Sequence, residues 1–275
     1  MNKQLFARQW RTTVRKNESD LYIETVYLDK FCEVEGWFTV QPGDFKILEA
    51  CIDVYRGPWE RGRRKLDGLL GREAYLGSSK IFLEAAQEDK RGIWAEVMLE
   101  GLKGLLQAEF WIHKDRGYSS FEDYERYFQD GFTDSCVYYS NLENVKTKFY
   151  QHAGPVRSDL LFTRHRSSFL EEREGRYYLT GSLMDSFHQM ALAIEVSKDR
   201  KVLAAKGQVI RSVDEICKKG EEQVAHLLGE PVSPQGWQKS VGGALGCTHL
   251  ADLARELART FQLWELFFQV IRMRD

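Results

Sequence analysis

Residues 240–253 read SVGGALGCTHLADL and combine a glycine-rich turn, two reactive side chains and the start of an apolar helical pattern. Cys247 follows Gly246 directly, and His249 comes two residues after Cys247. Apolar residues then recur at spacings of three and four. The free N–H groups and the dipole at a helix N-terminus favour a thiolate there. The stretch therefore predicts a tight glycine turn, a helix that begins near Cys247, and a candidate site in its first turn.

Several blocks of the second half of the chain resemble blocks of the first half, in the same order and at a nearly constant offset. These similarities predict an internal duplication. In the first half, Ile93 and Ala95 stand opposite Cys247 and His249, so only the second copy carries the reactive pair. The matched blocks are 5–8 with 161–164, 22–32 with 178–188, 48–56 with 203–211, 69–72 with 227–230, and 92–95 with 246–249.

Each copy is predicted to follow the order β-β-β-α-α. In the second copy, β-branched and aromatic content and turn residues predict strands over 162–170, 176–185, 189–196 and 202–211. Apolar spacing predicts an amphipathic helix over 213–228, followed by the helix that begins near residue 247. We expect an α+β protein made of two tandem diverged copies, each an antiparallel sheet covered by helices.

This reading divides the chain into three parts. Residues 1–114 form the first copy, which lacks the Cys/His set, and residues 159–275 form the second copy with the candidate site. Residues 115–158 form a connector that is rich in tyrosine and phenylalanine. We expect the connector to be either a helix plus a strand packed on one copy, or a lid over a site.

Four residues of the second copy are candidate metal ligands: His188, Cys217, Cys247 and His249. A strand start and two helix starts can meet at one end of a helix-covered sheet, which would bring these side chains together. Two cysteines and two histidines suit a tetrahedral zinc site, or the thiolate ligation of an iron–sulfur cluster. Opposite these four positions the first copy has Cys32, approximately Gly62, Ile93 and Ala95, so it cannot hold the same site.

Composition narrows the class of protein. The 275 residues carry a net charge of −2, which gives no global electrostatic reason to expect binding to nucleic acid or to an anionic membrane. No apolar run approaches the roughly 18 residues of a membrane-spanning helix, and the N-terminal residues lack the apolar core of a signal peptide. Five widely spaced cysteines are typical of reduced thiols. We therefore expect a cytoplasmic protein with no nucleic-acid or membrane partner.

The pattern GG-x-x-GCTHL at 242–250, together with His188-x-Met190 and Cys217, resembles the bacterial family known as domain of unknown function 2889. The resemblance covers about residues 161–261. Members of that family usually have an aspartate where this chain has Gln189. The family has no settled activity, so the resemblance supports the location of a site without naming its chemistry.

The same region also resembles the U-type iron–sulfur scaffold proteins. Residues 247–251 are similar to their Cys-x-x-Leu-Ala block, and Cys217 is similar to their second cysteine. The Cys-Gly-Asp segment of those scaffolds is replaced here by Ser186-Phe187-His188, and Gly246 stands where they have a histidine. The resemblance implies a shared fold more than a shared role in cluster transfer.

Three functions follow as hypotheses. The first is a zinc- or iron–sulfur-binding protein, such as a scaffold or accessory factor, with the centre in the second copy. The second is an enzyme that uses Cys247 as its nucleophile with His188 or His249 as the base. The third is a non-catalytic subunit or assembly protein, whose partner would be another protein or a second copy of the chain.

Overall fold

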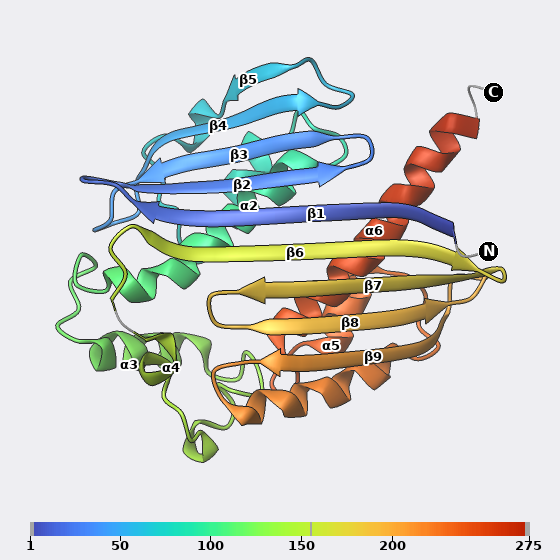
Figure 1. Ribbon diagram of the computed structural model, residues 1–275. Helices are drawn as coiled ribbons and strands as arrows, with labels where there is room; N and C mark the ends of the chain where they lie inside the picture. The colour runs from blue at the N-terminus through green and yellow to red at the C-terminus, as the bar shows by residue number, and fades with distance from the viewer. Residues whose placement is uncertain (1–2, 155, 273–275) are drawn as a thin grey trace. The chain divides into compact units, whose positions relative to one another are not determined.

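The computed structural model describes residues 3–154 and 156–272, and within them nine strands form one antiparallel sheet. Residues 1–2, 155 and 273–275, which fall in the predicted first copy, connector and second copy, lie outside the described residues. The strand order is β5-β4-β3-β2-β1-β6-β7-β8-β9 (Figure 1). The strands are β1 (Lys3–Lys16), β2 (Leu21–Asp29), β3 (Glu33–Val40), β4 (Ile47–Arg56), β5 (Gly62–Lys65), β6 (Leu160–Arg173), β7 (Arg176–Asp185), β8 (Gln189–Val196) and β9 (Val202–Arg211).

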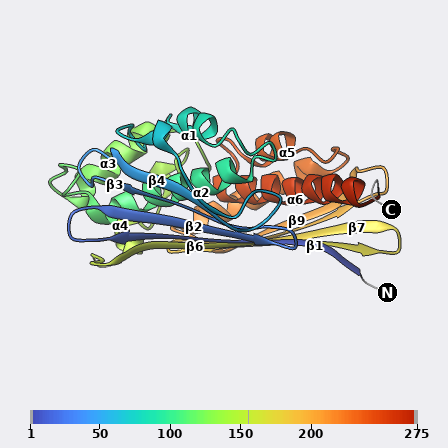
Figure 2. The same cartoon turned by 90° about the horizontal axis from the view of Figure 1, so that it is seen from above.

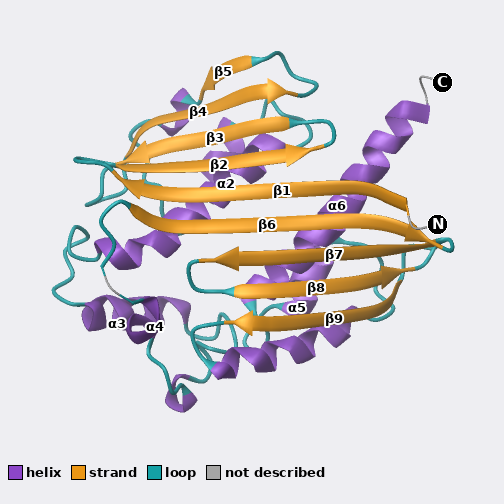
Figure 3. Ribbon diagram, viewed as in Figure 1, coloured by secondary structure: helices purple, strands orange, loops and turns teal. Residues whose placement is uncertain are grey.

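Helices connect and follow these strands (Figure 3). The α-helices are α1 (Ser79–Ala85), α2 (Ile93–Ala108), α3 (Phe121–Phe132), α4 (Phe149–Ala153), α5 (Pro234–Val241) and α6 (Thr248–Arg272). The 3-10 helices are η1 (Asp67–Leu69), η2 (Glu109–Ile112), η3 (Leu142–Asn144) and η4 (Glu215–Leu227). Among the described residues, no helix is both long enough and apolar enough to cross a membrane.

The predicted pair of separate sheets in two tandem β-β-β-α-α copies is wrong, because β1 and β6 are neighbours in one sheet. Both are 14-residue strands that open their halves of the chain. A long strand at the edge of a separate sheet would leave a row of backbone N–H and C=O groups unpaired, and pairing β1 with β6 removes both edges. The expected likeness to the U-type scaffold fold is accordingly not supported.

The strands of the second half were predicted well. β7, β8 and β9 have the predicted bounds, and β6 extends beyond the predicted strand at both ends. Glu174 and Gly175 both have positive φ, at 51° and 75°, as a two-residue type I′ turn between β6 and β7 requires.

The helices agree with the sequence only in part. α6 begins at Thr248, as the glycine turn predicts, and α2 begins at Ile93. The segment predicted as an amphipathic α-helix over 213–228 is instead the 3-10 helix η4, and α5 was not predicted. The connector contains α3, η3 and α4, and none of its described residues forms a strand, so the predicted strand is wrong.

The chain divides into two compact units, to which both β1 and β6 contribute. The C-terminal unit comprises Met1–Arg8, Tyr127–Ala153 and Arg166–Asp275, and the N-terminal unit comprises Gln9–Arg126 and Gly154–His165. The earlier three-part division of the sequence stays a prediction.

Each unit places one long helix on its strands (Figure 2). In the C-terminal unit α6 packs on β7 and β8, and in the N-terminal unit α2 packs on β2 and β3. Gly181 of β7 allows a close approach, since a Cβ there would lie 2.9 Å from Leu257 Cδ2 and 3.0 Å from Leu253 Cδ1. The N-terminal end of α6 is thereby held against the strands that carry the candidate site.

Candidate functional site

The turn from β7 to β8 is held by one aspartate and one arginine. Asp185 Oδ1 accepts hydrogen bonds from the backbone N–H groups of Phe187 (2.9 Å) and His188 (2.7 Å). The Arg211 guanidinium donates to the carbonyl oxygens of Asp185 (2.6 Å), Ser186 (3.1 Å) and His188 (3.2 Å). An aspartate that bonds its own turn fixes the local backbone, so His188 projects from a rigid support.

The same carboxylate orients the His188 ring. His188 Nδ1 lies 3.1 Å from Asp185 Oδ1, and both residues are buried. A carboxylate oxygen can only accept, so in the neutral ring Nδ1 carries the proton and Nε2 keeps its lone pair. The 3.1 Å between these two atoms is also a spacing that two ligands of one ion can have.

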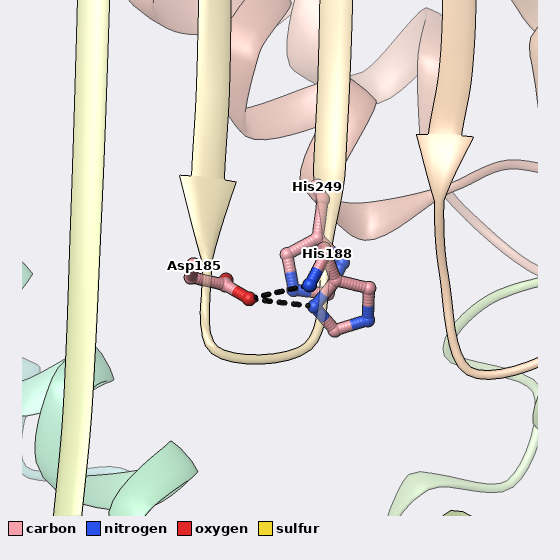
Figure 4. A group of neighbouring side chains, drawn as sticks. All are labelled: Asp185, His188 and His249. Atoms are coloured by element: carbon pink, nitrogen blue, oxygen red, sulfur yellow. Dashed lines mark hydrogen bonds and ion pairs between the residues drawn. The ribbon is translucent and has the colours of Figure 1, made fainter. Parts of the chain in front are cut away.

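His249 completes the group from the first turn of α6. Its ring stacks on that of His188, with centroids 3.8 Å apart and planes inclined by 30°. One ligand atom from each of Asp185, His188 and His249 lies within 4.8 Å of the other two (Figure 4). Donor atoms bound to one metal at about 2.0–2.2 Å lie about 3–4 Å apart. A limit of 4.8 Å is thus somewhat wider than the spacing in a formed metal site.

The glycine turn before α6 has two steric requirements that place His249. Gly243 has φ +82°, in the left-handed region that glycine adopts without strain. A Cβ on Gly246 would lie 2.0 Å from the Val241 carbonyl oxygen and 2.6 Å from that of Gly242. Backbone geometry thus explains Gly243 and Gly246, in agreement with the predicted tight glycine turn.

The two predicted cysteines differ from the two predicted histidines in their surroundings. Cys217 and Cys247 are buried and are not members of the metal-competent group found among the described residues. Burial raises the pKa of the Cys247 thiol to about 12 and that of the Cys217 thiol to about 11. Both thiols therefore stay protonated at neutral pH in the absence of a metal.

Cys247 has sulfur-containing side chains as neighbours. The Cys247 thiol contacts the Met190 thioether, with the two sulfurs 3.8 Å apart. Negative charge on Cys217 or Cys136 raises the pKa of Cys247 further, after burial itself, which indicates that these thiols are neighbours.

Sequence reasoning missed Asp185 as a member of the group. A signal was available, because the aligned blocks contain Asp29-x-x-Cys32 and Asp185-x-x-His188 at matching positions. A buried carboxylate three residues before a buried histidine at a strand start is a typical orienting partner. Met190 and Cys136 were also missed as sulfur neighbours of Cys247.

The connector is attached to each element that positions the site. The Val137 N–H donates to the Gly246 carbonyl (2.8 Å), and the N–H groups of Lys146 and Thr147 donate to Asp214 Oδ2 (2.9 and 2.8 Å). His152 Nε2 donates to the Phe187 carbonyl (3.1 Å), and burial lowers the pKa of His152. The described part of the connector within the C-terminal unit is thus packed on that unit.

Comparisons with known proteins place the candidate site within a family region. A comparison with curated proteins and with solved structures found no match. Residues 171–262, which contain Asp185, His188, Cys217, Cys247 and His249, match the family described as protein of unknown function DUF2889, and it is to this family that the C-terminal region of the chain is similar.

Proposed function

We propose that the C-terminal unit binds a divalent transition-metal ion through Asp185, His188 and His249. The convergence of two imidazoles and one carboxylate within 4.8 Å carries this proposal. Two histidines with a carboxylate suit zinc or non-haem iron, whereas magnesium and calcium prefer oxygen ligands throughout. Asp185 Oδ1 and His188 Nδ1 lie 3.1 Å apart, so an ion held by both residues would replace the proton between these atoms, and Nδ1 would be the ligand atom of that ring.

Three protein ligands leave at least one coordination position for water or a small molecule. Structural zinc sites are usually closed by four protein ligands, and sites that act on bound molecules keep an open position. His249 is only partly buried, so the group has an exposed side. We therefore favour a site at which the ion binds and polarises a small molecule over one that only stabilises the fold.

The cysteine-nucleophile hypothesis has weaker support. Cys247 is 5% exposed, and its thiol faces the Met190 thioether. A nucleophilic cysteine normally combines access to substrate with a lowered pKa, whereas burial raises the pKa of this thiol. The hypothesis of a non-catalytic assembly role is compatible with a metal site and stays open.

Metal titration of chelator-stripped protein tests the proposal. We expect one equivalent of Co(II) to give visible d–d absorption, and Zn(II) to displace it. His188→Ala and His249→Ala should each weaken Co(II) binding about 100-fold or more, and Asp185→Asn about 10- to 100-fold, because Asn keeps the turn-capping acceptor but loses the charge.

His226→Ala is the matched control, since His226 is an exposed histidine of η4 in the same unit. It should bind Co(II) as the unmodified protein does. Absence of Co(II) and Zn(II) binding to folded protein would overturn the proposal, as would binding that His188→Ala and His249→Ala leave unchanged.

A further inference from the structure

Residues 135–153 of the connector, which we call the strap, belong to the C-terminal unit. Their helices are η3, of three residues, and α4, of five residues. Helices this short are not stable by themselves in water, because few hydrogen bonds offset the cost of starting a helix. The strap therefore keeps its place through its contacts with the elements around it.

One end of the strap is bonded to the start of α6. The Val137 N–H donates to the Gly246 carbonyl at 2.8 Å, and the Thr248 hydroxyl donates to the Ser135 carbonyl at 3.4 Å. Thr248 is the first residue of the helix that carries His249. This end of the strap is thus attached to the element that supplies one ligand of the proposed metal site.

The other end of the strap is bonded to the turn between β7 and β8. His152 Nε2 donates to the Phe187 carbonyl at 3.1 Å, and the Phe149 ring packs on the Phe187 ring with centroids 4.8 Å apart. Phe187 is fully buried and lies in the turn that presents Asp185 and His188. The strap therefore joins the two elements that carry the three proposed ligands.

Asp214 holds the middle of the strap. Its Oδ2 accepts from the N–H groups of Lys146 (2.9 Å) and Thr147 (2.8 Å), while its Oδ1 caps η4 by accepting from the Ile216 N–H (2.9 Å). Burial alone would raise the pKa of the Asp214 carboxyl, but these backbone N–H groups lower it below its ordinary value. The latch is thus a charged carboxylate at neutral pH, and hydrogen bonds to a charged acceptor are stronger than those between neutral groups.

We infer that the strap is a gate over the proposed metal site, latched by Asp214, and that a divalent ion enters and leaves when the latch opens. The inference rests on the proposed function, since that function defines the site which the gate serves. Opening a segment that depends on a few contacts needs less free energy than unfolding the whole unit. His188 is only 6% exposed, so an ion or a reagent reaches its ring through such an opening.

The variant Asp214→Ala tests the gate on metal-free protein. Loss of the acceptor should accelerate amide hydrogen exchange at Lys146 and Thr147 about tenfold or more. Modification of His188 by diethylpyrocarbonate, followed by mass spectrometry, should accelerate about fivefold or more, because the ring is uncovered more often. Modification of His226, which is exposed in the folded protein, should keep its rate.

The metal-loaded protein gives a second readout. Release of bound Co(II) to excess EDTA should be about fivefold or more faster in Asp214→Ala, because the same opening lets the ion out. The visible absorption spectrum of the Co(II) protein should stay unchanged, since the variant keeps all three ligands. A substitution that only weakened the fold would not combine faster release with an unchanged spectrum.

Ser233→Ala is the matched control, because Ser233 caps α5 of the same unit by accepting from the Gly236 N–H at 3.1 Å. It loses a helix cap, as Asp214→Ala does, but leaves the strap in place, so His188 should react at its original rate. If Asp214→Ala does not fold, Asp214→Asn serves in its place, since it keeps one acceptor oxygen and should give a smaller change in the same direction.

The inference is overturned if the strap amides exchange no faster in the folded Asp214 variant. It is also overturned if they exchange faster while the His188 modification rate stays the same, or if Ser233→Ala accelerates modification equally. Failure of the unmodified protein to bind Co(II) would instead overturn the proposed function, and the modification rates would still show whether the strap covers His188.

Discussion

The turn Asp29–Cys32 of the N-terminal unit and the turn Asp185–His188 of the C-terminal unit have the same backbone support and different chemistry. Asp29 Oδ1 accepts from the N–H groups of Phe31 and Cys32, both at 2.6 Å, as Asp185 Oδ1 does from Phe187 and His188. Arg56 donates to three carbonyl oxygens of the first turn, as Arg211 does in the second. The aspartate and the arginine therefore belong to the architecture of the turn.

The strand pairs that follow the two turns also have irregularities in corresponding places. The β3–β4 pairing shifts register between Glu33 and Val34 and between Thr39 and Val40. The β8–β9 pairing shifts between Gln189 and Met190 and between Glu195 and Val196. These positions correspond in the sequence alignment of the two halves. The internal duplication itself stays a prediction, but the two halves share these local structures.

The difference lies in the side chains that each turn presents. Cys32 occupies the place of His188, and burial raises the pKa of its thiol to about 12. The first turn of α2 has Trp94 and Ala95 where the start of α6 has Thr248 and His249. The shared turn therefore does not by itself supply the ligands of the proposed metal site, because Cys32 and Ala95 stand where the C-terminal unit has His188 and His249.

The largest expected effect is a difference in stability loss between alanine substitutions of Gly246 and Gly92, the glycines that precede the two long helices. Gly246→Ala should lower the free energy of unfolding by about 3 kcal/mol or more, because its Cβ would meet backbone oxygens that cannot move aside. Gly92→Ala should cost only about 1–2 kcal/mol, the cost of a left-handed φ of +75°. Urea unfolding measures both, and equal losses would contradict the special role given to Gly246.

A smaller effect tests whether the two aspartates have the same structural role. Asp29→Ala and Asp185→Ala should each lower the free energy of unfolding by about 2 kcal/mol, because each leaves buried backbone N–H groups without their acceptor. Of the two variants, only Asp185→Ala should also weaken Co(II) binding. If Asp29→Ala were neutral in urea unfolding while Asp185→Ala was costly, the shared architecture of the turns would be contradicted.

The smallest expected effect concerns His152. This connector residue donates a hydrogen bond to the Phe187 carbonyl in the turn between β7 and β8. Burial lowers the pKa of His152 in the folded state, so the neutral ring is favoured there. Its contribution to stability is present above its ordinary pKa of about 6.5 and is lost as the pH falls below that value. His152→Gln keeps a donor for the Phe187 carbonyl and removes the titration.

The variant should therefore lose less stability than the unmodified protein between pH 7 and pH 5. Uptake of one full proton on unfolding changes the free energy of unfolding by roughly 1.4 kcal/mol per pH unit. The two proteins should differ in this slope by a fraction of that value. Urea unfolding across this range measures it on metal-free protein. Identical slopes for the two proteins would show that His152 does not titrate differently on folding.

Local sequence patterns predicted much of the C-terminal half. β-branched and aromatic content with turn residues predicted the strands, and the glycine turn predicted the start of α6. The motif that contains Cys247 and His249 also indicated the family to which residues 171–262 are similar. Each of these depends on residues close together in the chain, where spacing and steric demand can be read directly.

Tertiary structure decided the rest. The sequence could not show that β1 pairs with β6, because strand pairing across a long separation depends on which edges are left open after folding. Nor could it show that His188 and His249 meet Asp185 while Cys247 meets Met190, since those groupings depend on how α6 packs on the sheet. Residue types and local turns are encoded locally, whereas the donor atoms that can share one ion are selected by packing between distant segments.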